Sequence, residues 1–150
     1  MEVTNYKRES LWELFVSCIT TKFMQFSGRA RRREYWGFML FRFILLVFIL
    51  TGFFIGHSEP GEEGVLYSIL IIVLTVFYIG FLIPEIAVGV RRLHDIGKDG
   101  AWICINFIPT VGSIIFLVFS LMDSEPFENR YGDDPKRFER ESFSQESTKE

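Results

Sequence analysis

Three long stretches of this 150-residue chain are almost free of charged residues. They cover residues 36–55, 65–90 and 101–122, with Arg42 in the first, Glu85 in the second and no charged residue in the third. An α-helix needs about 20 apolar residues to cross the roughly 30 Å hydrocarbon core of a bilayer. Each stretch is long enough, and each is apolar on all sides, which indicates a lipid environment. The sequence therefore predicts an all-α membrane protein with three transmembrane helices.

The composition supports this prediction. Hydrophobic residues make up 49% of the chain and 17 residues are Phe, which is more than one small soluble core could bury. The length indicates a single domain. We expect a membrane domain over 1–136 and a disordered polar tail over 137–150, because the chain beyond Asp123 is too polar to offset the entropy cost of ordering. The net charge of −3 argues against a nucleic-acid partner.

Residues 10–26 form a shorter, amphipathic stretch in which aromatic and aliphatic residues recur at helical spacing. This pattern predicts an N-terminal helix lying in the membrane interface. A helix packed back on the bundle and a fourth membrane segment are the alternatives. No cleavable signal peptide is evident, because the N-terminus mixes acids with bases and lacks a small-residue cleavage site.

Lysine and arginine are unevenly distributed around the apolar stretches. The segments 27–34 (SGRARRRE) and 91–100 (RRLHDIGKDG) are basic, whereas the connection 57–64 (HSEPGEEG) has three acids and neither Lys nor Arg. The positive-inside rule then places the N-terminus and both basic segments in the cytoplasm. Three crossings would place the tail on the opposite side.

The two basic segments should meet at one membrane face, because a short turn joins the first two spans. Guanidinium groups bind phosphate bidentately, so this face could bind anionic lipid headgroups or a membrane protein partner. Alternatively, Glu34 could pair with Arg91 or Arg92 and Asp95 with Arg32, which would make the arginines structural. The candidate residues are Gly28, Arg29, Arg32, Arg33, Glu34, Tyr35, Trp36, Arg91, Arg92, His94 and Asp95.

The two charges inside the predicted spans lie at matching depths. Arg42 is six residues from one span end and Glu85 six from the next basic segment, which puts both about 9 Å below the same boundary. Because intramembrane charges are usually paired, we expect an ion pair between the first two helices. The alternative is that Arg42 snorkels and Glu85 is protonated or hydrated. Pro84 and Pro109 should kink their helices.

No strong catalytic or metal-binding pattern is present. His94 and Asp95 could form a general base and its orienting carboxylate, but no nucleophile is placed beside them. His57 and His94 are predicted on opposite faces, which disfavours a metal site, and Cys18 and Cys104 lie in apolar surroundings without metal spacing. We therefore expect no enzymatic activity, no cofactor and no metal.

Four motifs occur in order along the chain: GRARRREYW at 28–36, RRLHDIG at 91–97, IPTVG at 108–112 and ENRYGDDP at 128–135. With the apolar stretches between them, they resemble the domain-of-unknown-function 805 family of small bacterial inner-membrane proteins. The resemblance implies a multi-pass helical fold in the inner membrane and implies no activity. The expected function is therefore that of an inner-membrane protein whose cytoplasmic arginine-rich face binds anionic lipid or a partner, including a second copy. A subunit of a small oligomeric transporter or channel is the alternative.

Overall fold

The computed structural model describes residues 9–56 and 62–141. Within these ranges every regular element is a helix, and the β pairing is limited to an isolated bridge between Asn129 and Gly132. The predicted all-α fold is therefore confirmed for this part of the chain. The predicted turn over 57–64 falls largely outside the described residues. The elements are α1 (Leu11–Ile19), α2 (Arg32–Gly56), α3 (Glu62–Gly80), α4 (Leu82–Asp95), η1 (Gly100–Phe107) and α5 (Val111–Leu121).

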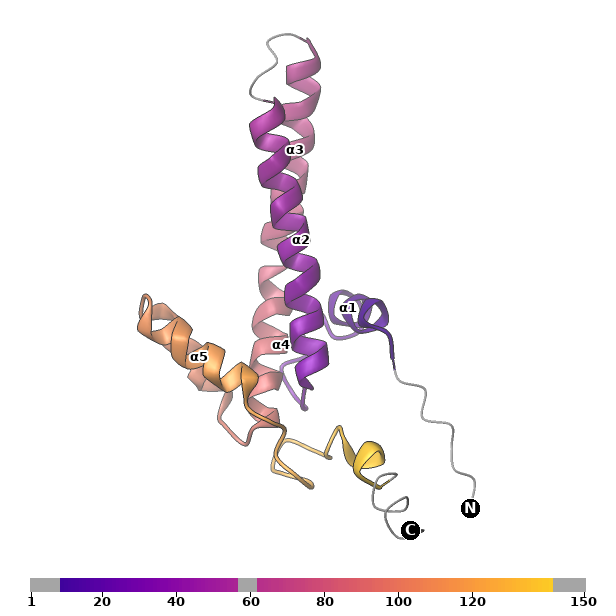
Figure 1. Cartoon of the computed structure of the whole chain (residues 1–150), viewed down its shortest axis with the longest axis vertical. Helices are drawn as coiled ribbons and strands as arrows, with labels where there is room; N and C mark the ends of the chain where they lie inside the picture. Colours follow the sequence, from indigo (N-terminus) through magenta and orange to yellow (C-terminus); the bar gives the residue numbers. More distant parts are fainter. Residues whose placement is uncertain (1–8, 57–61, 142–150) are drawn as a thin grey trace, which may run out of the picture.

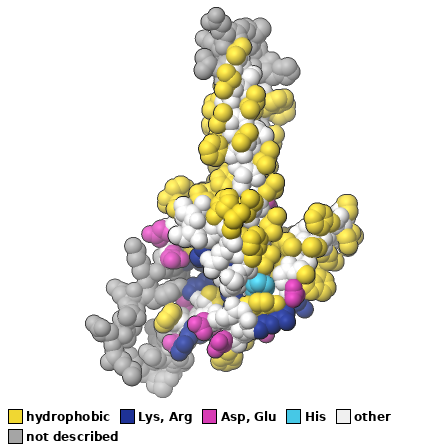
Figure 2. All heavy atoms as spheres, turned by 180° about the vertical axis from the view of Figure 1, so that it is seen from behind, with side chains coloured by type: hydrophobic (Ala, Val, Ile, Leu, Met, Phe, Trp, Pro, Cys, Tyr) yellow, Lys and Arg dark blue, Asp and Glu magenta, His cyan; other side chains and the backbone are white. Residues whose placement is uncertain are grey.

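Helices α2 and α3 form a tall hairpin, and α4 continues α3 toward the base of the molecule (Figure 1). The base is the end where α1, the end of α4 and the segment after α5 meet. The 25 residues of α2 extend about 37 Å, enough to cross a bilayer. Only 22% of the apolar window in α2 and 6% of that in α3–α4 are buried, whereas a core helix of a soluble protein would be mostly covered. Figure 2 shows hydrophobic side chains covering this hairpin and charged side chains gathered at the base.

The second apolar stretch is interrupted at Phe81, between α3 and α4. Pro84 lies three residues later, and a proline has no N–H to donate to the carbonyl one turn earlier, while its ring crowds that carbonyl. At the end of α3 the Phe81 amide is shared between the carbonyls of Phe77 and Tyr78, at 3.3 and 3.2 Å, as is common at helix termini. The interruption predicted from Pro84 is therefore present.

The third apolar stretch is not one helix. A 3₁₀ helix, η1, is followed by a reversal around Pro109, and α5 then returns alongside η1 as an arm that leaves the hairpin at an angle (Figure 1). The reversal is tight because Gly112 has no side chain: a Cβ there would lie 1.8 Å from the carbonyl oxygen of Ile105. Each half of the arm is roughly 16 Å long, about half the hydrocarbon thickness. The expectation of a continuous helix over 101–122 was wrong.

Helix α1 lies across the lower end of α2 (Figure 1). It starts with a capping box, in which the Ser10 hydroxyl accepts from the Glu13 amide and the Glu13 carboxylate accepts from the Ser10 amide. Its nine residues extend about 14 Å, too short to cross a membrane. Phe15 and Cys18 pack into the main hydrophobic cluster with Phe38 of α2 and Val88 of α4. The predicted helix is present, and the fourth-segment alternative is excluded by its length.

The chain after α5 returns to the base rather than leaving the molecule (Figure 1). Asp134 is buried and forms an ion pair with Arg140, with 3.0 Å between nitrogen and oxygen. Residues 137–141 form a short helical turn, which differs from the disorder predicted from 137 onward. Residues 142–150 lie outside the described part of the chain.

Candidate functional site

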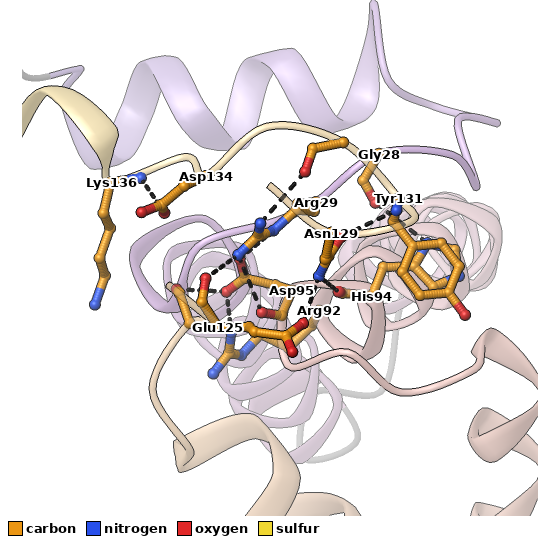
Figure 3. A network of polar contacts seen from close by, with 12 residues as sticks. Gly28, Arg29, Arg92, His94, Asp95, Glu125, Asn129, Tyr131, Asp134 and Lys136 are labelled. Carbon is orange, nitrogen blue, oxygen red and sulfur yellow. Dashed lines mark hydrogen bonds and ion pairs between the residues drawn. The ribbon is translucent and has the colours of Figure 1, made fainter. Parts of the chain in front are cut away.

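Asp95, the last residue of α4, is the centre of a polar network at the base (Figure 3). Its side chain is fully buried. Oδ1 accepts from Nε of Arg29 at 3.1 Å, and Oδ2 accepts from the Ser124 hydroxyl at 2.6 Å and from a guanidinium N–H of Arg92. A buried carboxylate is tolerated when it is paired and hydrogen-bonded. Asp95 therefore joins the segment before α2, the end of α4 and the segment after α5.

Two arginines hold the end of α5 to this network. Arg92 donates to the carbonyls of Ser120, at 3.2 Å, and Met122, and Nε of Arg32 donates to the same Met122 carbonyl at 2.8 Å. The last carbonyls of a helix have no partner within the helix, and cations interact favourably with this end of its dipole. Arg92 and Arg32 therefore cap α5 and fix the η1–α5 arm to the base.

A second buried centre lies between α1, α2 and α4. The Glu34 carboxylate accepts a hydrogen bond from a guanidinium N–H of Arg91. It also accepts one from the Lys22 ammonium, which lies 3.2 Å from the same oxygen. The Cys18 thiol lies 3.6 Å from the same carboxylate oxygen and 3.7 Å from Arg91. Burial, followed by the charge of Glu34, raises the pKa of Cys18 to about 11, so the thiol stays protonated at neutral pH. We call Arg29, Glu34, Arg91, Arg92 and Asp95 the arginine cluster.

Arg29 binds the segment after α5 through its backbone. Its guanidinium donates to the carbonyls of Glu125 at 2.5 Å, Phe127 at 2.7 Å and Gly132 at 3.3 Å. The side chain is 1% exposed, and these bonds, together with that to Asp95, occupy all three of its nitrogens. Arg29 is therefore a structural strap for residues 125–132 rather than an open anion site.

His94 is placed for packing rather than for acid–base chemistry. Its ring stacks on Tyr131 with centroids 3.7 Å apart, and its Nδ1 lies 3.2 Å from the Gly28 carbonyl, which can only accept. The Asp95 carboxylate faces the arginines instead. The predicted pairing of a general base with its orienting carboxylate is thus not formed. In the ranges 9–56 and 62–141, no group of three or more His, Cys, Asp or Glu residues is arranged to hold a metal ion.

The predicted site residues divide into two groups. The five residues of the arginine cluster, with Gly28, Arg32 and His94, are joined by contacts at the base, whereas Arg33, Tyr35 and Trp36 take no part in these contacts. Arg33 donates to the Glu9 carbonyl instead, at 3.4 Å. Of the predicted pairings, Glu34 with Arg91 is present, and Asp95 with Arg32 was wrong, because Arg32 reaches the end of α5 and Asp123 at 3.6 Å. The residues missed at the sequence level are Ser124, Asn129 and Tyr131; the last two lie in the ENRYGDDP motif, which signalled them without indicating what they contact.

Arg42 and Glu85 form an ion pair between α2 and α4, the pairing expected from their depths. Their side chains are 11% and 29% exposed. The Arg42 guanidinium also lies 4.6 Å from the ring centroid of Tyr78. Its Nε is buried and has no hydrogen-bond partner among the described residues.

Two adjoining cavities lie along the hairpin on the side of this ion pair. One, of about 490 Å³, is bounded by α2, α4, η1 and α5, and the other, of about 680 Å³, by α2, Tyr78 and Glu85. Tyr35, Met39 and Glu85 line both. We call the two together the lateral groove. Most of its lining is apolar, and its polar side chains include Tyr35, Arg42, Glu85, Asn106 and Ser113.

Residues 23–133 match the profile of a family described as a protein of unknown function, DUF805. The chain belongs to the DUF805 family. The chain is similar to two proteins from Escherichia coli (strain K12). Inner membrane protein YhaH is 37% identical over 119 residues, which cover 79% of this chain and 93% of the relative. Inner membrane protein YhaI is 35% identical over 119 residues, covering 79% and 92%. No solved structure matches at a significant level.

The family match confirms the resemblance predicted from the motifs. It extends from the segment before α2 to Asp133, so the DUF805 region contains the arginine cluster and the chain that Arg29 binds. Helix α1 lies before the matched residues, although Cys18 of α1 contacts Glu34 and Arg91 in the cluster.

Proposed function

We propose that this DUF805 protein is a non-enzymatic, multi-pass protein of the bacterial inner membrane whose base binds anionic lipid headgroups in the cytoplasmic leaflet. Helix α2 and the α3–α4 pair would cross the membrane, and the η1–α5 arm would enter it partway and return. The N-terminus and the segment after α5 would then both face the cytoplasm. The basic residues at the base support this orientation, and the names of the relatives support the inner membrane as the location.

The observation that carries the lipid proposal is that two cations, each near an exposed tryptophan, have no carboxylate partner among the described residues. Arg33 donates only to the Glu9 carbonyl, at 3.4 Å. Arg33 and Lys98 form no ion pair with any other described residue. Trp36, one turn after Arg33 in α2, is 38% exposed, and Trp102 of η1 is 46% exposed. Tryptophan is enriched at the level of the headgroups, and a basic residue there gains about 1 kcal/mol from anionic lipid.

Lys98 shares its position with aromatic side chains of the arm. Its ammonium lies 6.0 Å from the ring centroid of Phe119, and Trp102 packs edge-on against the same ring at 5.7 Å. A cation held above an aromatic pair is suited to the boundary between headgroups and hydrocarbon. We therefore assign headgroup binding to Arg33 and Lys98 rather than to the buried arginines.

The test is the lipid composition retained by the purified protein. We would incorporate it in nanodiscs of phosphatidylglycerol and phosphatidylcholine and count the lipids retained by native mass spectrometry. Replacing Arg33 and Lys98 by Ala should lower the preference for phosphatidylglycerol by about fivefold per residue. The matched control is Arg137→Ala, an exposed arginine of the tail paired with Glu141.

An unchanged preference in the double variant would contradict the proposal, as would a wild-type protein without any preference. A stoichiometric protein partner that excludes lipid from the base would also contradict it.

A further inference from the structure

The polar side chains of the lateral groove have hydrogen-bonding capacity that the protein does not use. Tyr35 is 7% exposed and lines both cavities, yet its hydroxyl makes no hydrogen bond to any residue in the described ranges. The side chains of Asn106 and Ser113 are likewise without a hydrogen bond to another described residue. The Tyr35 side chain is largely covered, but its hydroxyl is not among the buried atoms and stays accessible from the groove, as do the exposed residues Asn106 and Ser113. Polar groups without a partner are costly where water is scarce, so unpaired donors that line a groove point to a ligand.

The depth of these groups indicates which part of a lipid they would meet. Tyr35 precedes Trp36, whose exposed ring suits the headgroup level, and the Arg42–Glu85 pair lies about 9 Å deeper along α2. The hydrocarbon core begins just below the headgroups. Tyr35 and the polar side chains between these levels therefore face the glycerol and ester groups of a lipid rather than its phosphate.

The chemistry of the lining agrees with an ester ligand. Ester carbonyls only accept hydrogen bonds, and Tyr35, Ser113 and the Asn106 amide all offer N–H or O–H donors. Much of the remaining lining is apolar and lies along α2, as at Met39, Phe43 and Leu46. An acyl chain could lie against this row of side chains. The volumes of the two cavities, about 490 and 680 Å³, are within the usual range of ligand sites, about 300–1,000 Å³.

We propose that the lateral groove binds one glycerophospholipid by its ester carbonyls, through Tyr35, Asn106 and Ser113, with an acyl chain along α2. The inference rests on the proposed placement of the base in the cytoplasmic leaflet. The site differs from the headgroup contacts of Arg33 and Lys98 because it recognises the glycerol ester region and does not distinguish headgroups by charge. Glu85 and Arg42 neutralise each other at the end of the groove that lies farther from the base. The groove therefore has no net charge with which to select an anion.

The experiment compares two lipids that differ only in the linkage of the chains. The protein is placed in nanodiscs containing equal amounts of a dioleoyl ester phosphatidylglycerol and its dialkyl ether analogue, which lacks the carbonyls. Native mass spectrometry then measures which lipid remains on the protein. Wild type should retain one ester lipid preferentially, and Tyr35→Phe and Ser113→Ala should each lower the ester-to-ether ratio about fivefold, the effect of losing one hydrogen bond.

Folding should not limit this test, because the Tyr35 hydroxyl has no hydrogen bond with other described residues to lose. Tyr67→Phe, the same change in α3 outside the residues that line the groove, is the matched control and should leave the ratio unchanged. Equal retention of ester and ether lipids by wild type would overturn the inference, as would a ratio that Tyr35→Phe and Ser113→Ala do not alter. The arms also separate the two proposals: the Arg33 and Lys98 variants should change the preference for phosphatidylglycerol over phosphatidylcholine and leave the ester-to-ether ratio intact.

Discussion

The arginine cluster and the lateral groove differ in how their polar side chains are hydrogen-bonded. In the cluster, Arg29 and Asp95 are almost inaccessible and bond to several protein groups. In the groove, the Tyr35 residue is 7% exposed, but its hydroxyl stays accessible from the cavity and bonds to no other described residue. The sequence placed Tyr35 and the arginines in one motif and one candidate site. The structure separates them into a framework whose side chains bond to one another, with only Nε of Arg91 left without a partner among the described residues, and a cavity that still has capacity to bind.

The largest effect should come from removing the centre of the cluster. Asp95→Ala leaves the cations of Arg29 and Arg92 buried without their carboxylate, and breaking a buried ion pair costs about 3–5 kcal/mol. We expect a large decrease in the melting temperature measured in detergent. Asp99→Ala is the control, because Asp99 is 62% exposed and lies 3.9 Å from Arg130, so that only its cap on the Ala101 amide is lost, at a cost of about 1 kcal/mol. Equal melting temperatures for wild type and Asp95→Ala would show that the cluster does not hold the base together.

A charge exchange tests the polar pair that borders the groove. Glu85→Arg places two cations side by side within the apolar stretch and should lower the folded yield strongly. Adding Arg42→Glu restores opposite charges and should recover a coupling of about 0.5–3 kcal/mol. Folded yield by size-exclusion chromatography is the measurement. A double variant that folds worse than either single variant would rule out the pairing as a source of stability.

The reactivity of the Cys18 thiol tests whether the base is closed around it. Cys18 is fully buried and its raised pKa, about 11, keeps it as the unreactive thiol at pH 7–8. We expect maleimide to leave Cys18 unmodified in the folded Cys104→Ser variant and to modify it in the same variant carrying Glu34→Gln, which leaves Arg91 without its carboxylate. Mass spectrometry of the intact protein measures the modification. Rapid modification of Cys18 without the Glu34 change would contradict a closed base.

The smallest effect concerns the exposed edge of the base. The hydrogen bond from Lys136, followed by the Ser124 amide, lowers the pKa of Asp123. A lowered pKa stabilises the fold above the unfolded value of about 3.9, and this stabilisation is lost as pH falls through the folded pKa. Because Asp123 is 63% exposed, Asp123→Asn should cost less than about 1 kcal/mol at pH 7. The difference in melting temperature between wild type and variant should shrink steadily as pH falls below about 4; a difference that stays constant from pH 7 through the acid range would assign the effect to something other than this charge.

The sequence predicted the parts of the fold that depend on composition and spacing. Apolar length predicted α2 and the α3–α4 pair, and equal depth predicted the contact of Arg42 with Glu85. It did not predict the reversal within 101–122, because a helix that crosses and an arm that folds back have the same apolar composition. Pro109 and Gly112 marked the place, but only the approach of Gly112 to the Ile105 carbonyl shows why the chain can turn there.

The bonds of the segment after α5 were missed for a different reason. Its polar composition predicts a tail without enough apolar surface to fold, yet Arg29 binds it through backbone carbonyls, which leave no mark in the sequence. Asp95 was expected to pair with Arg32 on the basis of charge alone. The register of α4 and the position of the segment before α2 bring Arg92 and Arg29 to it instead.

The side of the membrane on which the C-terminus lies tests the central claim most directly. If the η1–α5 arm enters and returns, the base holds both ends of the chain at one face. We would fuse green fluorescent protein or alkaline phosphatase to Glu150 of the full chain, since the first is fluorescent only in the cytoplasm and the second active only outside it. A fluorescent fusion with an inactive phosphatase is expected. An active phosphatase with a dark fluorescent protein would show that α5 ends on the far side, and the account of the base would be wrong.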